Sequence, residues 1–354
     1  MSTIDTLLRI GAFGVGLIGV VVFLRSTLRV GILNRRPRDG LARRIGLIVR
    51  HAITFIARHK RNYSDVQDTM AWALPLFLLS LIAAWFVLVQ LSFSLMIWAV
   101  EAESDLPQAF VASGSALSTL GFATPSSAAG RVLAIFEGAF GLGVIVFMFT
   151  FIPGYVSVVQ MREDRVAWLY GRAGRCPTSS SLIEWCYEAG QGDDMTPIWN
   201  DSERWFIGVL ETHSLTPLLA LAPSVDDEKT WVGAAGVILD AASIALSTLE
   251  VKGLSSARLC HETGVNALDL VAREFAASDL DAYARAHADP GADYDAAYER
   301  LIAAGAAVRP DREACRANFL TLRSQYEGSI RRIASAALMP IDQPWVLPQE
   351  KREG

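Results

Sequence analysis

A short run of small and hydroxyl-bearing residues, 117–127, reads LSTLGFATPSS and lies between two long apolar stretches. It offers the Thr119 hydroxyl and a row of backbone carbonyls, and such oxygens replace the water around a monovalent cation in selective pores. Backbone outside a helix is tolerated at membrane depth only where protein buries it or where it lines a water-filled path. The segment is therefore a candidate lining for a cation path. Its candidate site residues are Thr119, Leu120, Gly121, Phe122 and Ala123.

The residues just before this segment predict a helix too short to cross a bilayer. Ser104 or Asp105 can cap its start, and Pro107 suits a first helical turn. Small and apolar residues then continue to Ser118, which gives about a dozen residues where a crossing needs about 20. The C-terminal end of such a helix carries partial negative charge, which favours a nearby cation.

Three apolar runs predict the membrane spans that would hold this loop. No charged residue occurs between Asp68 and Glu101, and a second run, about 132–159, carries only Glu137. A weaker run covers about 7–24, and its glycines permit close packing on another helix. Those glycines are Gly11, Gly14, Gly16 and Gly19.

The segment 25–61 orients these spans. It holds 11 Lys and Arg residues, with Asp39 as its one acid, so the positive-inside rule places it in the cytoplasm. The N-terminus and residues 101–130 then lie outside, and everything after residue 160 is cytoplasmic. The stretch RRIGLIVRHAITFIARHK within this segment predicts a helix on the anionic inner leaflet. We expect a multi-pass protein of the plasma (inner) membrane that binds anionic lipid through residues 25–61 and binds no nucleic acid.

Charge divides the chain at about residue 160. Residues 1–160 carry 13 basic and 8 acidic residues, whereas residues 161–354 carry 19 and 29. The later half shows amphipathic helical patterns without sustained strand alternation, which predicts an all-α cytoplasmic domain. The expected helices are 180–189, 201–212, 229–249, 255–277, 294–304 and 312–337. The expected organisation is an N-terminal span (1–28), a basic segment (29–68), a pore module (69–160) and a helical domain (161–354).

Other chemistry finds little support in the sequence. The four cysteines match no CxxC pattern, and the acidic clusters do not follow calcium-loop spacing, so no metal site is expected. There is no GxGxxG turn, no HExxH and no nucleophile–base pattern, so we expect neither a dinucleotide site nor an enzyme. Whether the helical domain binds a cytoplasmic ligand or partner is left open.

The order of span, short helix, Thr-Leu-Gly-Phe and a second span beginning GRVLAIFEGAFGLGVIVF resembles the pore module of the potassium-channel superfamily. The likeness covers about residues 70–160 and is closest to bacterial two-transmembrane members. The filter of that family reads Thr-Val-Gly-Tyr-Gly, with Phe a common substitute for Tyr. The resemblance implies that the Thr119 hydroxyl and carbonyl form the innermost ion site, with the carbonyls of Leu120, Gly121 and Phe122 above it. It also implies K⁺ as the permeant ion, no other cofactor, and a homotetramer, because one loop per chain supplies a quarter of a filter.

Further roles follow from the same resemblance. Gly143 falls where the inner helix of the family carries a hinge glycine, although Gly138, Gly141 and Pro153-Gly154 are other bending points. Glu137 is expected to brace the back of the pore through hydroxyls of the filter region.

The acids of the external loop allow two interpretations. Glu101, Glu103 and Asp105 would either form rings of negative charge at the outer mouth or cap the neighbouring helices.

The chain also departs from the family pattern. Ala123 replaces the second filter glycine, whose conformation disfavours a Cβ atom, and Thr124 and Pro125 replace the usual acid. A weakly selective cation channel that also passes Na⁺ is therefore a first alternative. The second is a membrane-anchored helical scaffold or sensor that conducts nothing.

Overall fold

The computed structural model describes residues 3–31, 39–101, 105–213, 216–224, 229–275 and 290–339. Across these ranges the regular elements are α-helices, and β-pairing is limited to two isolated bridges, Asp194–Lys252 and Leu249–Val308. The expectation of an all-α protein is confirmed for these residues. The chain divides into two compact units, Met1–His51 with Leu74–Ser157, and Ala52–Ala73 with Val158–Gly354.

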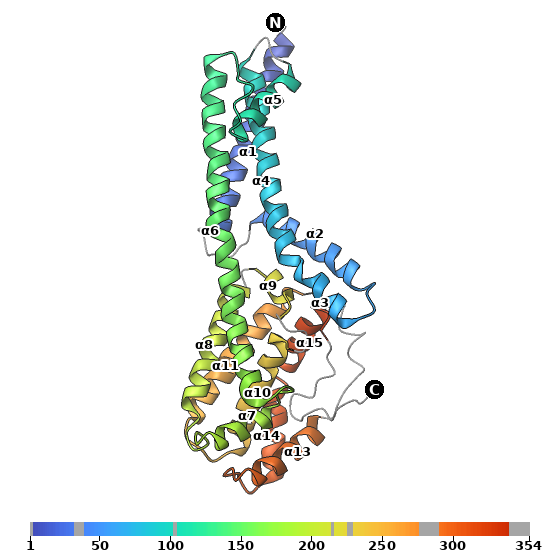
Figure 1. The fold of residues 1–354 in the computed structure, drawn as a ribbon, viewed down its shortest axis with the longest axis vertical. Helices are drawn as coiled ribbons and strands as arrows, with labels where there is room; N and C mark the ends of the chain where they lie inside the picture. The colour runs from blue at the N-terminus through green and yellow to red at the C-terminus, as the bar shows by residue number, and fades with distance from the viewer. Residues whose placement is uncertain are drawn as a thin grey trace. The chain divides into compact units, whose positions relative to one another are not determined.

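The first unit contains the long apolar helices α1 (Thr3–Gly31) and α4 (Ala73–Val100) and the first part of α6 (Ala128–Ala173) (Figure 1). Each is long and apolar enough to cross a membrane. At 1.5 Å per residue α4 is about 42 Å long, which matches a bilayer with its headgroups, whereas α6 is about 69 Å long. The α6 helix runs without a break through the predicted boundary at residue 160, although it holds Pro153 in its interior.

Helices α1 and α4 pack antiparallel. Arg9 donates to the carbonyls of Trp98 and Glu101 at the C-terminal end of α4, at 2.7 and 2.5 Å. At the other end of the pair, the indole N–H of Trp85 donates to the hydroxyl of Ser26 at 2.9 Å. A cation at a helix C-terminus is favoured by the helix dipole, so Arg9 helps to fix the register of α1 on α4.

Glycines permit the close approach between these two helices. A Cβ atom at Gly16 would lie 2.5 Å from the carbonyl oxygen of Ser92, and one at Gly19 would lie 2.1 Å from its hydroxyl oxygen. The predicted packing role is confirmed for these two glycines. Gly11 and Gly14 make no such contact within the described chain, because no atom lies within 4 Å of a Cβ atom built at either position.

The short helix predicted before the candidate site is α5 (Leu106–Leu117). Asp105 caps it by accepting a hydrogen bond from the backbone N–H of Gln108 at 2.9 Å, and Pro107 lies in the first turn. At 12 residues, α5 is about 18 Å long, which is little more than half of a hydrocarbon core.

The basic stretch predicted to be helical forms α2 (Gly40–Ala57), and α3 (Tyr63–Ala71) follows it. Asp39 caps α2 by accepting from the N–H groups of Leu41 and Ala42 at 3.0 and 2.9 Å. Four apolar side chains of α2 are exposed in the chain by itself, as a helix on a lipid surface requires. They are Leu47, Ile48, Phe55 and Ile56.

The second unit is a helical domain around α10 (Trp231–Thr248), which is buried along nearly its whole length. Its contacts are with α7 (Ser179–Glu188), α11 (Leu254–Ala272), α14 (Arg312–Arg323) and α15 (Glu327–Ala336). Among its described residues the unit also contains α3, the last part of α6, and the helices α8 (Thr196–His213), α9 (Leu218–Leu221) and α13 (Pro290–Ala303). Helix α10 is apolar and long enough to span a membrane, but it is the core of this unit.

One predicted helix of this unit is wrong. The expected helix 312–337 is divided into α14 and α15 by Ser324–Tyr326. The Ser324 hydroxyl donates to the carbonyl of Thr321 at 2.7 Å, a local bond that competes with the helical ladder. After the turn, the Tyr326 hydroxyl donates to the carboxylate of Asp240, which gives the buried charge on α10 a partner.

Candidate functional site

The α5 helix is held between α4 and α6. The Ser113 hydroxyl on α5 lies 3.0 Å from the carbonyl oxygen of Gln90 and 2.5 Å from the carboxylate of Glu137. Glu137 is fully buried, so its side chain belongs to the packing around α5. The Oε2 atom of Glu137 has no hydrogen-bond partner among the described residues. The hydrogen bond that Ser113 donates to Oε1 therefore links Glu137 to α5.

Two glycines allow α6 to reach the C-terminal end of α5. A Cβ atom at Gly141 would lie 2.4 Å from the carbonyl oxygen of Leu117, and one at Gly138 would lie 3.3 Å from that of Ala116. These glycines, which the sequence offered as bending points, therefore serve close packing behind the candidate site. Gly143 differs, since nothing lies within 4 Å of a Cβ atom built there and α6 passes through it unbroken.

The backbone after α5 folds back onto Ser115. The N–H groups of Leu120 and Gly121 both donate to the Ser115 carbonyl, at 3.1 and 3.3 Å. The N–H of Ala123 donates to the Ser115 hydroxyl at 2.9 Å, and Ser115 is fully buried. One serine of α5 thus holds three backbone N–H groups of the candidate site.

These bonds set the direction of the carbonyls. In a planar trans peptide, the C=O of one residue points opposite to the N–H of the next. Because the N–H groups of residues 120, 121 and 123 point toward Ser115, the carbonyls of Thr119, Leu120 and Phe122 point away from α5. This leaves a set of oxygen ligands on the side of the segment that faces away from its support.

Positive φ angles alternate along the segment. Thr119 has a φ of 58° and Gly121 has a φ of 71°. Such angles are uncommon for a β-branched residue and cost of order 1–3 kcal/mol, so the structure around Thr119 must hold it there. Ala123 does not have a positive φ. The position in this segment that combines a side chain with a strained conformation is therefore Thr119.

The acids of the external loop have different environments. Glu101 is buried, and its carboxylate accepts from the N–H of Ser127 at 2.8 Å and from the Ser126 hydroxyl at 3.2 Å. Asp105 is exposed and caps α5. Of the two interpretations, helix capping describes the contacts of both residues. Glu103 lies outside the described residues.

Arg131 holds the segment from its C-terminal side. Its guanidinium donates to the carbonyls of Pro125 and Ser126 at 3.2 and 3.0 Å. The candidate site is therefore fastened at both ends, to Ser115 before it and to Glu101 and Arg131 after it.

The side chains of the site are open to solvent in the chain by itself. Leu120 is 72% exposed and Phe122 is 68% exposed. Exposed apolar side chains of this size are a feature of surfaces that become covered by lipid or protein.

Sequence reasoning named the segment but missed Ser115, which holds it. The available signal was VASGSALS, where Ser113 and Ser115 interrupt a short apolar helix just before the site. In the structure the Ser113 hydroxyl donates to Glu137 on α6, and the Ser115 hydroxyl accepts from the backbone of the candidate site.

No cluster of three or more His, Cys, Asp or Glu side chains suited to a metal ion occurs in the described part of the chain. Comparisons of the chain with known protein families, with curated proteins and with solved structures found no match.

Proposed function

We propose that the chain is one subunit of a cation channel that prefers K⁺, in which four copies place residues 119–122 around a common axis. The observation that carries this proposal is the anchoring of three N–H groups to Ser115, which aims the carbonyls of Thr119, Leu120 and Phe122 away from α5. Four such rows around an axis would supply rings of oxygens in place of the hydration shell of the ion.

The proposed site also has a favourable field. The C-terminal end of α5 lies directly beside the segment, because Leu120 and Gly121 bond to its Ser115 carbonyl. Partial negative charge at this helix end stabilises a cation at about the level of Thr119. No side-chain carboxylate is needed at the ion, which agrees with the burial of Glu137 against Ser113.

The proposed selectivity rests on the inner part of the site. The N–H groups of Thr119, Leu120 and Gly121 all donate hydrogen bonds to carbonyls of α5. These bonds fix the spacing of the Thr119 and Leu120 carbonyls. Ala123, which stands where the potassium-channel pattern has a glycine, keeps an ordinary backbone conformation and a bond to Ser115. We therefore expect K⁺ to be favoured over Na⁺, with the outermost site the weakest.

Gating would involve α6, which lines the axis and continues past the membrane. No atom lies within 4 Å of a Cβ atom built at Gly143, and Pro153 lacks the N–H that would close a helical bond. In the proposed topology the N-terminus is outside, the C-terminal domain is cytoplasmic, and α2 lies on the anionic inner leaflet.

The test compares the same substitution at two glycines of the membrane unit, Gly121→Ala and Gly14→Ala, in liposomes with K⁺ or Na⁺ gradients. Gly121 has a positive φ that alanine disfavours, whereas Gly14 lies in open space on α1. We expect cross-linked tetramers from all proteins, a K⁺ flux that the Gly121 variant lowers at least tenfold, and no loss with the Gly14 variant. Equal K⁺ and Na⁺ fluxes would show a channel that does not select between the two ions. A folded protein that neither forms tetramers nor carries a flux would contradict the channel proposal and leave the membrane-anchored scaffold as the alternative.

A further inference from the structure

A cavity of about 490 Å³ lies in the second unit, between α8 and the part of α6 that follows the membrane span. This volume falls in the range of sites for small organic molecules. The α6 wall includes Met161, Arg165 and Trp168, and the α8 wall includes Trp205 and Val209.

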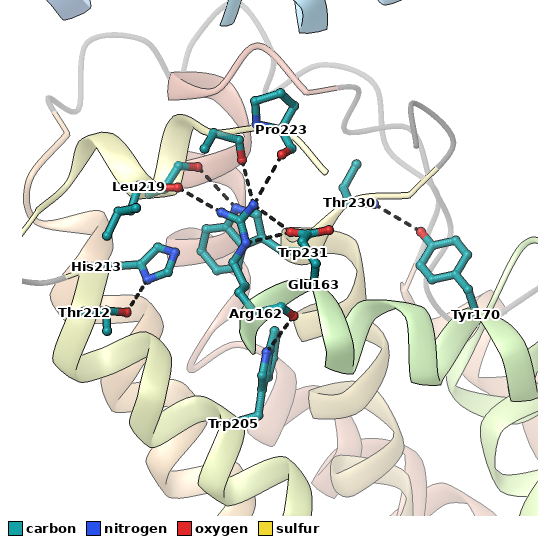
Figure 2. Close-up of polar contacts among 12 residues, drawn as sticks. Arg162, Glu163, Tyr170, Trp205, Thr212, His213, Leu219, Pro223, Thr230 and Trp231 are labelled. Atoms are coloured by element: carbon teal, nitrogen blue, oxygen red, sulfur yellow. Dashed lines mark hydrogen bonds and ion pairs between the residues drawn. The ribbon is translucent and has the colours of Figure 1, made fainter. Parts of the chain in front are cut away.

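Arg162 closes one side of the cavity and is itself fully satisfied. Figure 2 shows its guanidinium among carbonyls at the end of α9, where it donates to Leu219 and Ala222 at 2.9 and 3.0 Å. It also pairs with the carboxylate of Glu163 at 2.6 Å. The indole N–H of Trp205 donates to the Arg162 carbonyl at 3.1 Å, which joins the two walls. Arg162 is therefore a structural cation with its charge already compensated.

Arg165 is buried as well, but its charge is not compensated in this way. One guanidinium nitrogen donates to the Ile198 carbonyl at 3.1 Å and to the Ser202 hydroxyl, and the group stacks on Trp168 at 3.7 Å. No carboxylate of the described residues forms an ion pair with Arg165, and its Nε atom has no hydrogen-bond partner among them. The charge of Asp201 acts on Arg165, but the two side chains form no ion pair. A buried cation without a directly paired anion is costly, so an anion beside Arg165 would be favourable.

The rest of the lining agrees with an anionic ligand that has an apolar body. Arg204 adds an exposed cation, although it pairs with Asp201 at 3.1 Å, and Asp164 is the other acid of the lining. The lining also includes the indole rings of Trp168 and Trp205 and the side chains of Met161 and Val209. The Trp168 ring is already stacked by the guanidinium groups of Arg165 and Arg172. Indole rings and a thioether provide apolar contact for a flat or linear hydrocarbon body.

His213 contributes a neutral polar group to the cavity. Burial, with the charge of Arg162 as a smaller cause, lowers the pKa of His213 to about 3. Its Nδ1 atom lies 2.8 Å from the Thr212 hydroxyl, and its Nε2 atom has no partner among the described residues (Figure 2). At neutral pH the imidazole adds no charge, so the arginines decide the sign of the ligand.

We propose that this cavity binds a small organic anion, in which a carboxylate or phosphate group meets Arg165 and an apolar body lies against Trp205 and the other apolar side chains of the lining. The proposal concerns the second unit alone and does not depend on ion conduction.

The test uses the full chain in lipid nanodiscs, with empty nanodiscs as the blank. Binding of 3-phenylpropionate and phenyl phosphate is measured by calorimetry against the neutral 3-phenylpropanol and against inorganic phosphate. We expect saturable binding of at least one aromatic anion, at least tenfold tighter than either comparison compound. Equal binding of the neutral alcohol, binding of inorganic phosphate alone, or no saturable binding would each overturn the proposal.

Two glycine variants locate the site. Gly208 lines the cavity, and no atom lies within 4 Å of a Cβ atom built there, so Gly208→Leu adds a side chain that starts in open space at the cavity. Gly171 on α6 is also open and lies away from the cavity lining, which makes Gly171→Leu the matched control. We expect Gly208→Leu to weaken anion binding at least tenfold and Gly171→Leu to leave it unchanged. Unchanged binding in a folded Gly208→Leu protein would contradict this location.

Discussion

The hydroxyl of Ser115 accepts a hydrogen bond from the backbone N–H of Ala123 at 2.9 Å, while the carbonyl of the same serine accepts from Leu120 and Gly121. One buried residue thereby ties the last turn of α5 to both ends of the Thr-Leu-Gly-Phe-Ala segment. Since a peptide N–H and the preceding carbonyl point in opposite directions, this tie also sets where the carbonyl oxygens face.

Removal of the Ser115 hydroxyl is expected to loosen the outer end of the segment. In Ser115→Ala, the N–H of Ala123 loses its acceptor, which costs about 1 kcal/mol or more for a partly buried group. We expect the ratio of K⁺ to Na⁺ flux to fall severalfold, because the Phe122 carbonyl loses its fixed direction.

The control for this change is Ser118→Ala. The Ser118 hydroxyl donates to the Gly114 carbonyl within α5, and Ser118 is exposed. Its loss should alter neither the flux ratio nor the thermal stability. A Ser115→Ala protein with the flux ratio of the unmodified chain would show that the hydroxyl does not position the segment.

The packing of α1 on α4 predicts opposite effects of one substitution at two glycines. Gly16→Ala would push a Cβ atom to within 2.5 Å of the Ser92 carbonyl oxygen, and such overpacking costs about 1–3 kcal/mol. Gly14→Ala meets no atom within 4 Å and improves helix propensity by about 1 kcal/mol. Thermal unfolding in detergent should place the Gly16 variant below the unmodified chain and the Gly14 variant at or above it. The reverse order would exclude this register of α1 on α4.

The buried His213 makes the second unit sensitive to acid. Its pKa is lowered to about 3, chiefly by burial, whereas an unfolded histidine titrates near its ordinary value of about 6.5. Between these values the unfolded chain binds a proton that the folded chain does not, so stability is lost as the pH falls below about 6.5. The loss reaches about 2 kcal/mol at pH 5, at 1.36 kcal/mol per pKa unit.

Matched histidine variants isolate this contribution from that of other groups, including His261, whose pKa is also lowered by burial. His213→Gln should flatten the dependence of the unfolding free energy on pH between pH 5 and 7. His51→Gln should leave it unchanged, since His51 is exposed. Parallel pH profiles for His213→Gln and the unmodified chain would mean that folding does not lower the pKa of His213.

Cysteine reactivity tests the proposed orientation. Cys176 is exposed, whereas Cys186, Cys260 and Cys315 are buried, and burial raises the pKa of the Cys186 and Cys260 thiols to about 12. Thiolates react and thiols do not, so a membrane-impermeant maleimide should label Cys176 alone in the native protein.

We expect that label in inverted membrane vesicles and not in right-side-out vesicles. After denaturation, all four cysteines of the chain should react, which serves as the control for reagent access. Labelling of Cys176 from the outside would reverse the orientation inferred from the basic segment.

Much of the helical architecture could be predicted from local features. The cap at Asp105 with Pro107, the uncharged run after Asp68 and the amphipathic pattern of α2 each correspond to a helix in the structure. Where prediction failed, a local competitor decided, as at Ser324, whose hydroxyl bond to Thr321 accompanies the end of α14.

What the sequence by itself determined is the set of apolar helices, the short α5 and the Thr-Leu-Gly-Phe segment after it, because caps, charges and hydrophobic runs act over a few neighbouring residues. Only the tertiary structure decided that Ser115 holds Ala123, that Glu101 caps the start of α6 instead of facing solvent, and that Gly16 is packed where Gly14 is open. These outcomes depend on which surfaces meet once the helices pack. Residues of the same type, such as Gly14 and Gly16, differ only by the side of α1 on which they lie, and α4 contacts one of those sides.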